Sequence, residues 1–327
     1  MNILSIDGGA SQTRGVIFSP SGVVHIFRST EPTSLSRPGS VSIEVLKHFI
    51  PAMTEEAGLK LPDVDLICLG LAGTSNEAAR ESLFKEMNTL DVGRRLVITS
   101  DAEAAFESVW GAEPGALISV GTGAIGWARD EQGITYRAAG RGPQLGGDPG
   151  SGYWLGKTLL VRLIMREADA SPELDTMRQV VIDHYHAANF EDAARLAGES
   201  ADDIHMLAGL GRPICEEAEK GNQIALAILQ EGSMTLAEEI LDMLDRASLK
   251  REVMTLGMNG SILVRNRIFR QQLAEAMLYE VPEIDWKGPD LDPAFGAGLL
   301  AARLQDISPD KEALKASWAG LDVPALG

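Results

Sequence analysis

Short apolar runs separated by turn residues open the chain. The runs cover residues 2–7, 14–18 and 23–28, and the stretches between them are rich in Gly, Ser and Pro. These residues favour tight turns because they permit or impose the backbone angles that turns require. The pattern therefore predicts an antiparallel meander of three strands, with Asp7 at the rim of its first hairpin.

Strand and helix patterns alternate after this meander. Compact apolar runs cover 64–71 and 96–99, and apolar residues recur at helical spacing over 41–57, 76–87 and 102–109. This alternation predicts a mixed α/β sheet with helices on its faces. Ligands of such sheets gather at the carboxyl ends of the strands. The residues at those ends are Asp7, Gly70 to Thr74, Ser100 and Asp101.

The opening hairpin pattern occurs a second time. Residues 3–18, ILSIDGGASQTRGVIF, and residues 116–130, ALISVGTGAIGWARD, both run from an apolar strand through a glycine-rich turn into another strand. A further turn and strand follow each copy. Two similar hairpins about a hundred residues apart indicate duplicated domains facing one another, each offering one turn to a triphosphate.

The rest of the chain has mostly helical patterns. Apolar stripes at helical spacing run through 155–249 and predict core-forming helices. A strand pattern at 253–256 enters the small-residue stretch 257–261, against which a base and a ribose could lie. Pro293 suits the first turn of a final helix. We expect two domains, residues 1–115 and residues 116–327, the second enlarged by helices.

The charge of the chain argues against several classes of function. Acidic residues outnumber basic residues 47 to 29, which gives a net charge of −18. Such a surface repels nucleic acid and anionic lipid. No apolar run approaches the ~20 residues that a membrane-spanning helix needs, and the first residues lack a basic leader. We therefore expect a cytoplasmic protein that binds neither nucleic acid nor membrane.

The strongest candidate for chemistry is the stretch 97–127. Asp101 follows a strand pattern and could accept a proton from an alcohol. About twenty residues later, Gly121, Thr122 and Gly123 offer backbone N–H groups and a hydroxyl to a phosphate, because glycines let the backbone approach an anion closely. A proton acceptor close to a phosphate-binding turn indicates phosphoryl transfer.

A loop rich in glycine, residues 141–157, follows the second hairpin. Asp148 lies there between a Gly-Gly pair and Pro149. Two interpretations stand on an equal footing. Asp148 caps the helix that can start near Ser151, or the loop closes over a small substrate.

These stretches, in this order, resemble the N-acetylglucosamine kinase family (BadF/BadG/BcrA/BcrD-type ATPases) of the sugar kinase/Hsp70/actin superfamily. The matching stretches are Ile6 to Thr13, Thr99 to Ala102, Ile118 to Ala124, Leu145 to Asp148, Gly150 to Trp154, Gly257 to Ser261 and Pro293 to Leu300. The resemblance implies two RNase H-like (actin-like ATPase) domains around a central cleft. It also implies ATP- and Mg²⁺-dependent phosphorylation of the C6 hydroxyl of an amino sugar, either N-acetylglucosamine, glucosamine or a close relative, by a homodimer.

The resemblance assigns roles to residues at matching positions. Asp101 is expected to be the catalytic base on the sugar hydroxyl, and Asp7 the carboxylate that organises magnesium. The residues expected to bind ATP are Gly8, Gly9, Ser11, Gln12, Thr13, Gly121, Thr122, Gly123, Gly257, Asn259, Gly260 and Ser261. Those expected to bind the sugar are Ser100, Asp101, Thr122, Gly147 and Asp148. Ser11, Gln12 and Pro149 stand where the family usually has glycine, lysine and glutamate.

Two other functions compete with the kinase. An activator ATPase of the kind that serves benzoyl-CoA reductase or 2-hydroxyacyl-CoA dehydratase needs cysteines at a dimer interface to hold an iron–sulfur cluster. Cys68 and Cys215 stand singly in strand and helix patterns, so we expect buried free thiols instead. A non-catalytic sugar or nucleotide sensor on the same fold would not need Asp7, Asp101 and the Gly-Thr-Gly turn together.

Overall fold

The computed structural model describes residues 1–9, 12–29, 31–36, 41–142, 147–200 and 204–319. The chain forms two compact units, one from Met1–Glu113 and the segment that begins at Pro289, the other from Pro114–Gly288. Each unit holds a five-stranded mixed sheet with helices, which confirms the predicted α/β fold. Among the described helices, none combines the length and apolarity needed to cross a membrane.

The first sheet is a meander extended by two parallel strands. Its order is β3-β2-β1-β4-β5, with antiparallel pairing from β3 to β1 and parallel pairing from β1 to β5. Its strands are β1 (Ile3–Gly8), β2 (Thr13–Phe18), β3 (Val24–Ser29), β4 (Leu66–Leu71) and β5 (Leu96–Ser100). The register aligns Asp7 with Gly70 and Gly70 with Thr99. The carboxyl ends of three parallel strands, where ligands gather, therefore meet at one edge.

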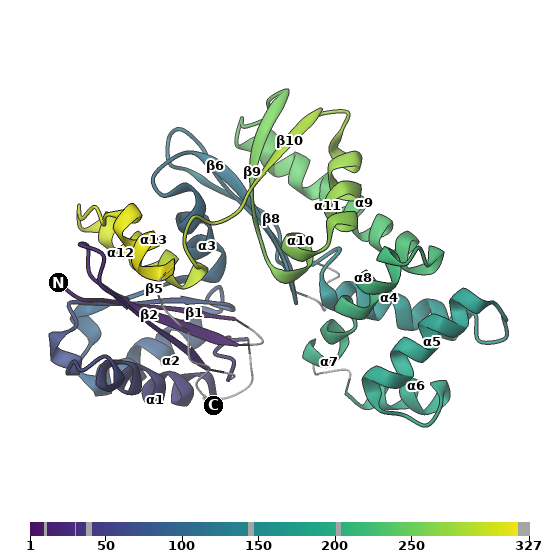
Figure 1. Cartoon of the computed structure of the whole chain (residues 1–327), viewed down its shortest axis with the longest axis horizontal. Helices are drawn as coiled ribbons and strands as arrows, with labels where there is room; N and C mark the ends of the chain where they lie inside the picture. The colour runs from purple at the N-terminus through teal and green to yellow at the C-terminus, as the bar shows by residue number, and fades with distance from the viewer. Residues whose placement is uncertain (10–11, 30, 37–40, 143–146, 201–203, 320–327) are drawn as a thin grey trace. The chain divides into compact units, whose positions relative to one another are not determined.

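Helices cover both faces of the first sheet (Figure 1). Leu4 and Ile6 pack against α1 (Val41–Glu56) and α2 (Glu77–Met87), while Ile3 and Phe18 pack against α3 (Asp101–Trp110), α12 (Gly296–Leu304) and α13 (Lys311–Ala319). Side chains alternate along a strand. Asp7 therefore lies on the face that carries α3 and α12. The 3₁₀ helices of this unit are η1 (Leu61–Asp63), η2 (Asn88–Leu90), η3 (Gly93–Arg95) and η5 (Pro293–Phe295).

The second sheet repeats the topology of the first. Its order is β10-β9-β6-β7-β8, again an antiparallel meander extended by two parallel strands. Its strands are β6 (Gly115–Val120), β7 (Ala124–Arg129), β8 (Thr135–Ala139), β9 (Val253–Asn259) and β10 (Glu283–Lys287). Reading β8-β7-β6-β9-β10 against β3-β2-β1-β4-β5 confirms the duplication that the two hairpin patterns predict.

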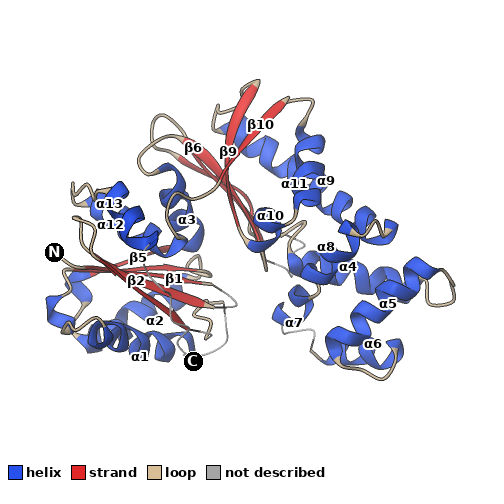
Figure 2. Ribbon diagram, viewed as in Figure 1, coloured by secondary structure: helices blue, strands red, loops and turns tan. Residues whose placement is uncertain are grey.

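Helices inserted between β8 and β9 enlarge the second unit, as the sequence predicts. Its helices, blue in Figure 2, are α4 (Gly152–Met165), α5 (Pro172–Tyr185), α6 (Phe190–Glu199), α7 (Ile204–Gly209), α8 (Gly211–Glu219), α9 (Gln223–Arg246), α10 (Ser261–Arg265) and α11 (Arg267–Met277). One buried cluster joins Ile118 and Val120 of the sheet to Leu155 of α4 and Ile240 of α9. The apolar stripes of the inserted helices thus form core, as expected.

The C-terminal segment packs against the first sheet, which differs from the expected division at residues 116–327. The Phe18 and Phe295 ring centroids are 5.2 Å apart, and the buried Ser5 hydroxyl accepts a hydrogen bond from the Gly298 N–H at 2.8 Å. A Cβ atom on Gly296 would lie 1.9 Å from the Ala104 carbonyl oxygen. Glycine at 296 therefore lets α12 approach α3 closely. The helical pattern after Pro293 predicts the helix, but it does not show which sheet the helix packs against.

Candidate active site

The first hairpin pairs an aspartate with an arginine. Asp7 on β1 lies directly opposite Arg14 on β2, and Arg14 Nη2 lies 3.4 Å from Asp7 Oδ2. Arg14 Nη1 donates a hydrogen bond to Asp292 Oδ2 at 3.0 Å. The guanidinium thus bridges two carboxylates, one from the hairpin and one from the residue that precedes η5.

Burial and neighbouring charges raise the pKa of Asp7 to about 6. The Asp7 side chain is 18% exposed, and its removal from water is the largest cause of the increase. The charges of Asp101 and Asp292 raise this pKa further, whereas Arg14 lowers it through its charge and its hydrogen bond. Asp7, Asp101 and Asp292 together therefore carry more negative charge than Arg14 offsets.

Asp101 begins α3 at the carboxyl end of β5. Ser100 caps this helix, because its hydroxyl oxygen accepts a hydrogen bond from the Glu103 N–H at 3.0 Å. The Thr99 hydroxyl donates to Glu103, which further fixes the first turn. Asp101 is half-buried, and the positive end of a helix stabilises a carboxylate in its first turn. The structure therefore places a candidate proton acceptor close enough to Asp7 to influence its ionisation.

The turn after β1 is built differently from a simple phosphate loop. Gly9 N–H donates to the Gln12 carbonyl at 3.1 Å, and Gln12 is exposed. A Cβ on Gly8 would lie 2.2 Å from Thr33 Oγ1, so packing already explains this glycine. Thr13 is buried and its hydroxyl donates to the Glu31 carbonyl at 2.6 Å. Of the residues predicted to bind ATP here, Gln12 is thus exposed and Thr13 is not, while Ser11 lies outside the described residues.

The Gly-Thr-Gly turn of the second hairpin is docked on the start of α4. Gly152 N–H donates to the Gly121 carbonyl at 2.8 Å, and Tyr153 N–H donates to the Thr122 carbonyl at 3.3 Å. The Ser151 hydroxyl accepts from the next N–H of the helix. The turn and the helix cap therefore use the first N–H groups of α4, and this fixes Gly121, Thr122 and Gly123 in place.

Asp148 holds the loop beside this turn rather than capping the helix. Ser151 is the cap of α4, so the capping interpretation of Asp148 is wrong. Asp148 is 8% exposed and accepts hydrogen bonds from the backbone N–H groups of Gly142, Gly140 and Ala124. Burial raises the pKa of Asp148 despite these bonds. A Cβ on Gly123 would lie 3.0 Å from Asp148 Oδ2, so the turn and the predicted sugar-binding aspartate are neighbours.

Gly147 lies in the same loop as Asp148. Its N–H donates to the Gly142 carbonyl at 3.1 Å, and its carbonyl accepts from the Arg141 N–H at 3.4 Å. Gly147 is buried. A Cβ there would lie 3.0 Å from Arg141 Cα, so loop closure explains this glycine without a ligand.

The corner between β9 and α10 lies against the end of β6. Strand β9 runs to Asn259, so Gly257 and Asn259 lie in the sheet and not in the expected loop. Gly257 pairs with both β6 and β10, which is why the strand continues. Gly260 has a φ of 82° and lies against the Val120 backbone. A Cβ on Gly121 would lie 3.7 Å from the Ser261 nitrogen, so the predicted phosphate and adenosine residues of this unit adjoin.

Two residues of the first cluster, Arg14 and Asp292, were not among the predicted site residues. Arg14 had a detectable signal, because a hairpin with Asp7 at its rim sets Arg14 directly across from it. Asp292 had none, because an ion pair between residues 278 positions apart leaves no trace in periodicity. The cluster therefore needs the fold to be recognised.

The carboxylate cluster of the first unit fits magnesium better than a metal held by protein ligands alone. Among the described residues, no group of three His, Cys, Asp or Glu side chains is arranged to hold a metal ion. Magnesium commonly binds through one or two carboxylates together with water and substrate phosphates. Asp7, with a carboxylate whose ionised form lacks full compensation, is suited to that mode.

Comparison with known proteins gives one family and several relatives of similar length. The sequence profile of the BadF/BadG/BcrA/BcrD ATPase family matches residues 4–301. The N-acetylmuramic acid/N-acetylglucosamine kinase of Clostridium acetobutylicum is 22% identical over 300 residues. The N-acetyl-D-glucosamine kinase of Dictyostelium discoideum is 27% identical over 312 residues. Each alignment covers 91% of this chain and 97% of the relative.

A solved structure shows the same fold. The protein from Chromobacterium violaceum, described provisionally as an N-acetylglucosamine kinase, superposes with a TM-score of 0.72 at 21% identity. The superposition covers 92% of this chain and 98% of that one.

Proposed function

Because this chain belongs to the BadF/BadG/BcrA/BcrD ATPase family, we propose that it transfers the γ-phosphate of ATP to an amino sugar. The acceptor is the C6 hydroxyl of N-acetylglucosamine, glucosamine or a close relative. The kinase names of both curated relatives support this choice. The observation that carries it is Asp101, set at the start of α3 and within electrostatic reach of the Asp7 cluster.

Asp101 acts as the base in this proposal. The C6 oxygen of the sugar forms a bond to the γ-phosphorus, the bond to the β–γ bridging oxygen breaks, and ADP leaves. The hydroxyl proton passes to the Asp101 carboxylate. Phosphoryl transfer requires positioning and charge neutralisation more than covalent participation by the protein. A half-buried carboxylate in the first turn of a helix meets that requirement.

The residues assigned to ATP in this proposal are Asp7, the two hairpin turns and the corner after β9. Magnesium, when bound, supplies positive charge that offsets the charge of the phosphates, and Asp7 would hold it. The turns at 8–13 and 121–123 would donate backbone N–H groups to phosphate oxygens. Strand β9 ends at Asn259, two residues after Gly257, so we assign the adenosine mainly to Asn259, Gly260 and Ser261, at and beyond the end of the strand.

The sugar is assigned to Ser100, Asp101, Thr122, Gly147 and Asp148. Asp148 already accepts three backbone hydrogen bonds, so its contribution to the sugar site includes holding the loop beside Gly123. A cytoplasmic homodimer belongs to the same proposal. Light scattering of the purified protein tests the dimer.

The cysteines give no support to an activator ATPase. Both cysteines of the chain are buried free thiols, Cys68 in β4 and Cys215 in α8. Burial raises the pKa of the Cys215 thiol to about 12 and that of Cys68 further still. Thiolates ligate iron–sulfur clusters, and buried thiols with raised pKa values resist ionisation.

Replacing Asp101 by asparagine tests the assigned base. A general base typically contributes 10²- to 10⁴-fold, so kcat of Asp101→Asn should fall by about that factor, with the KM for ATP little changed. The assay is sugar-dependent ADP release. Glu103→Gln is the matched control, because Glu103 lies in the same helical turn and its substitution removes the same charge. Turnover retained by Asp101→Asn would refute the assignment.

A further inference from the structure

We propose that Arg14 and Asp292 are positioning residues that hold the Asp7 carboxylate for Mg²⁺-dependent nucleotide binding. This inference rests on the proposed function, because it takes Asp7 as the magnesium carboxylate. The geometry points to a chain of contacts that starts at η5, passes through the guanidinium of Arg14 and ends on one oxygen of Asp7.

The first link is the anchoring of Asp292. Its Oδ1 atom accepts a hydrogen bond from the Ala294 N–H at 3.0 Å, which caps η5. Its Oδ2 atom accepts from Arg14 Nη1 at 3.0 Å. The Asp292 side chain is 11% exposed, and the neighbouring Phe295 is fully buried against Phe18. Both oxygens of Asp292 are therefore engaged by groups fixed in the core of the unit.

The second link is the guanidinium of Arg14. Its side chain is 28% exposed, and its buried Nε atom has no hydrogen-bond partner among the described residues. Leaving a buried donor unpaired costs free energy. The Arg14 side chain nevertheless adopts a conformation in which its two terminal nitrogens reach Asp292 and Asp7. Such an arrangement favours bridging two carboxylates over maximising hydrogen bonds.

The third link is the unequal sharing of Arg14 between the two carboxylates. Arg14 lies 3.0 Å from Asp292 but 3.4 Å from Asp7. Asp292 therefore takes the closer contact and leaves Asp7 only partly neutralised. Asp7 Oδ2 faces Arg14, and the Asp7 carboxylate held in this way would bind the metal. Partners that orient a metal ligand in this way affect metal affinity without touching the metal.

Two other roles for Arg14 give different measurable results. Arg14 could serve only to join β2 to the C-terminal segment, in which case its loss lowers stability and leaves nucleotide binding unchanged. It could instead contact a phosphate directly, in which case its loss weakens nucleotide binding with and without magnesium. Positioning of Asp7 affects only the part of the affinity that depends on magnesium.

Calorimetric titration with the non-hydrolysable ATP analogue AMPPNP separates the three roles. The full chain is titrated with saturating Mg²⁺ and again with EDTA, and the ratio of the two affinities is the magnesium-dependent gain. Arg14→Lys keeps the charge but loses the two-pronged bridge. Asp292→Asn keeps an oxygen that can cap η5 but loses the charge that anchors Arg14. For both variants we expect the gain to fall by about 10- to 100-fold, with the affinity in EDTA unchanged within error.

Arg303→Lys is the matched control. Arg303 also joins the C-terminal segment to the first part of the chain, through Nε and Nη2 contacts of 2.8 and 2.9 Å to the buried Glu107. This variant should lose thermal stability and keep the full magnesium-dependent gain. Equal losses with Mg²⁺ and with EDTA in Arg14→Lys would overturn the inference in favour of a direct phosphate contact. An unchanged gain in both test variants would overturn it in favour of a structural ion pair.

The wild-type titration separates this inference from the proposed function. AMPPNP binding that magnesium does not strengthen would contradict the assignment of Asp7, and with it the inference. Magnesium-dependent AMPPNP binding together with no sugar-dependent ADP release would contradict the sugar kinase alone. The comparison of the variants then still decides the role of Arg14 and Asp292.

Discussion

Asp7 shows how its surroundings set the properties of one carboxyl group. Removal from water and the charges of Asp101 and Asp292 outweigh the attraction of Arg14, so the pKa of Asp7 rises to about 6. At neutral pH the Asp7 carboxyl is therefore ionised, and its ionisation lowers the stability of the folded protein. A protein keeps such a cost where function requires the charge. This supports the assignment of Asp7 to magnesium.

Asp7→Asn should therefore stabilise the protein while abolishing its activity. The folded-state pKa lies above the ordinary value of 3.8, so the folded state binds the extra proton, and stability falls as pH rises from about 4 to about 6. Because asparagine does not ionise, the variant does not lose stability over this pH range. In EDTA, its free energy of unfolding should exceed that of wild type by about 1 to 3 kcal/mol at pH 7.5 and match it near pH 4. Urea unfolding of both proteins at the two pH values measures this.

A constant difference between the two proteins across that pH range would contradict the raised pKa of Asp7. Asp63→Asn is the control, since Asp63 lies in the exposed η1 turn of the same unit. EDTA is needed because a bound cation would itself favour the ionised carboxylate.

The sequence predicted the residues that follow strand ends and missed those that meet only through the fold. Asp7 and Asp101 were predicted from the carboxyl ends of parallel strands, and the structure sets them close together. Thr13 was expected to bind ATP, yet its hydroxyl donates a hydrogen bond to the Glu31 carbonyl. Asp292 was missed because only tertiary packing brings η5 to the first hairpin. Motifs thus predicted the carboxylates at the strand ends but not the residues that pack beside them.

At the scale of elements, boundaries depend on neighbours that the local sequence does not show. Strand β9 continues through Gly257 to Asn259 because β6 and β10 pair with it on both sides. The pattern of the sequence ended this strand at residue 256, since glycine and asparagine are unusual in strands. The inserted helices were predicted more closely, because their apolar stripes are long and regular.

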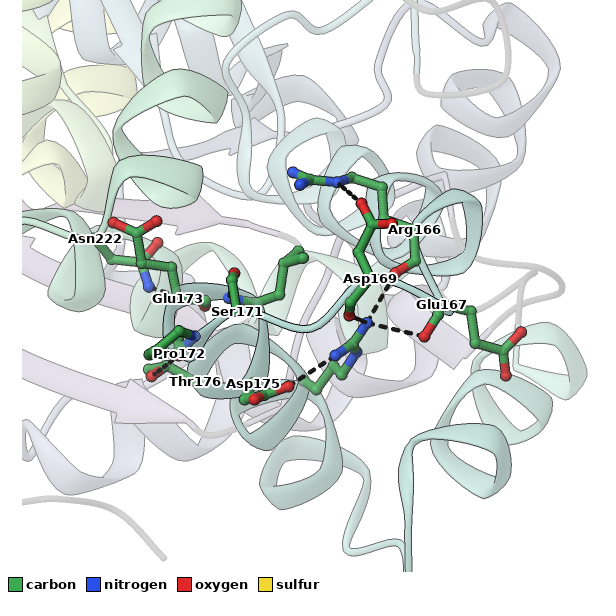
Figure 3. Close-up of polar contacts among 11 residues, drawn as sticks. Arg166, Glu167, Asp169, Ser171, Pro172, Glu173, Asp175, Thr176 and Asn222 are labelled. Carbon is green, nitrogen blue, oxygen red and sulfur yellow. Dashed lines mark hydrogen bonds and ion pairs between the residues drawn. The ribbon is translucent and has the colours of Figure 1, made fainter.

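One arginine contacts three carbonyl oxygens of the link between α4 and α5. Arg178 Nη2 donates hydrogen bonds to the carbonyl oxygens of Arg166, Glu167 and Asp169 at 2.8, 3.2 and 2.8 Å. Figure 3 labels these three residues together with Asp175, whose carboxylate accepts a hydrogen bond from Arg178 Nη1 at 2.7 Å. A cation at the end of a helix satisfies carbonyl oxygens that lack partners within the helix.

Arg178→Ala should lower the free energy of unfolding by about 2 kcal/mol, because hydrogen bonds to charged groups contribute roughly that much. Catalysis should be unchanged, since Arg178 belongs to the helical insertion. The control is Arg195→Ala, whose exposed ion pairs within α6 should be worth at most ~0.5 kcal/mol each. Urea unfolding followed by circular dichroism checks both variants. Equal stability losses would show that Arg178 holds the link no better than a surface ion pair.

At the scale of the whole molecule, the two sheets share one strand order and one set of strand directions. The repeated hairpin pattern made this duplication predictable. The return of residues 289–319 to the first unit was not predictable, because a helix pattern does not name its packing partner. That return also supplies Asp292, so the division of the chain and the composition of the candidate site have the same cause.

ADP release by the wild-type protein with a panel of sugars tests whether it is an amino-sugar kinase. The panel contains N-acetylglucosamine, glucosamine, N-acetylmuramic acid and glucose, each with ATP and Mg²⁺, and NMR coupling to phosphorus locates the phosphate on the product. We expect an amino sugar to stimulate ADP release and to carry the new phosphate on C6. ADP release that no sugar stimulates, or a product with its phosphate on another carbon, would contradict the proposed phosphorylation of an amino sugar at C6.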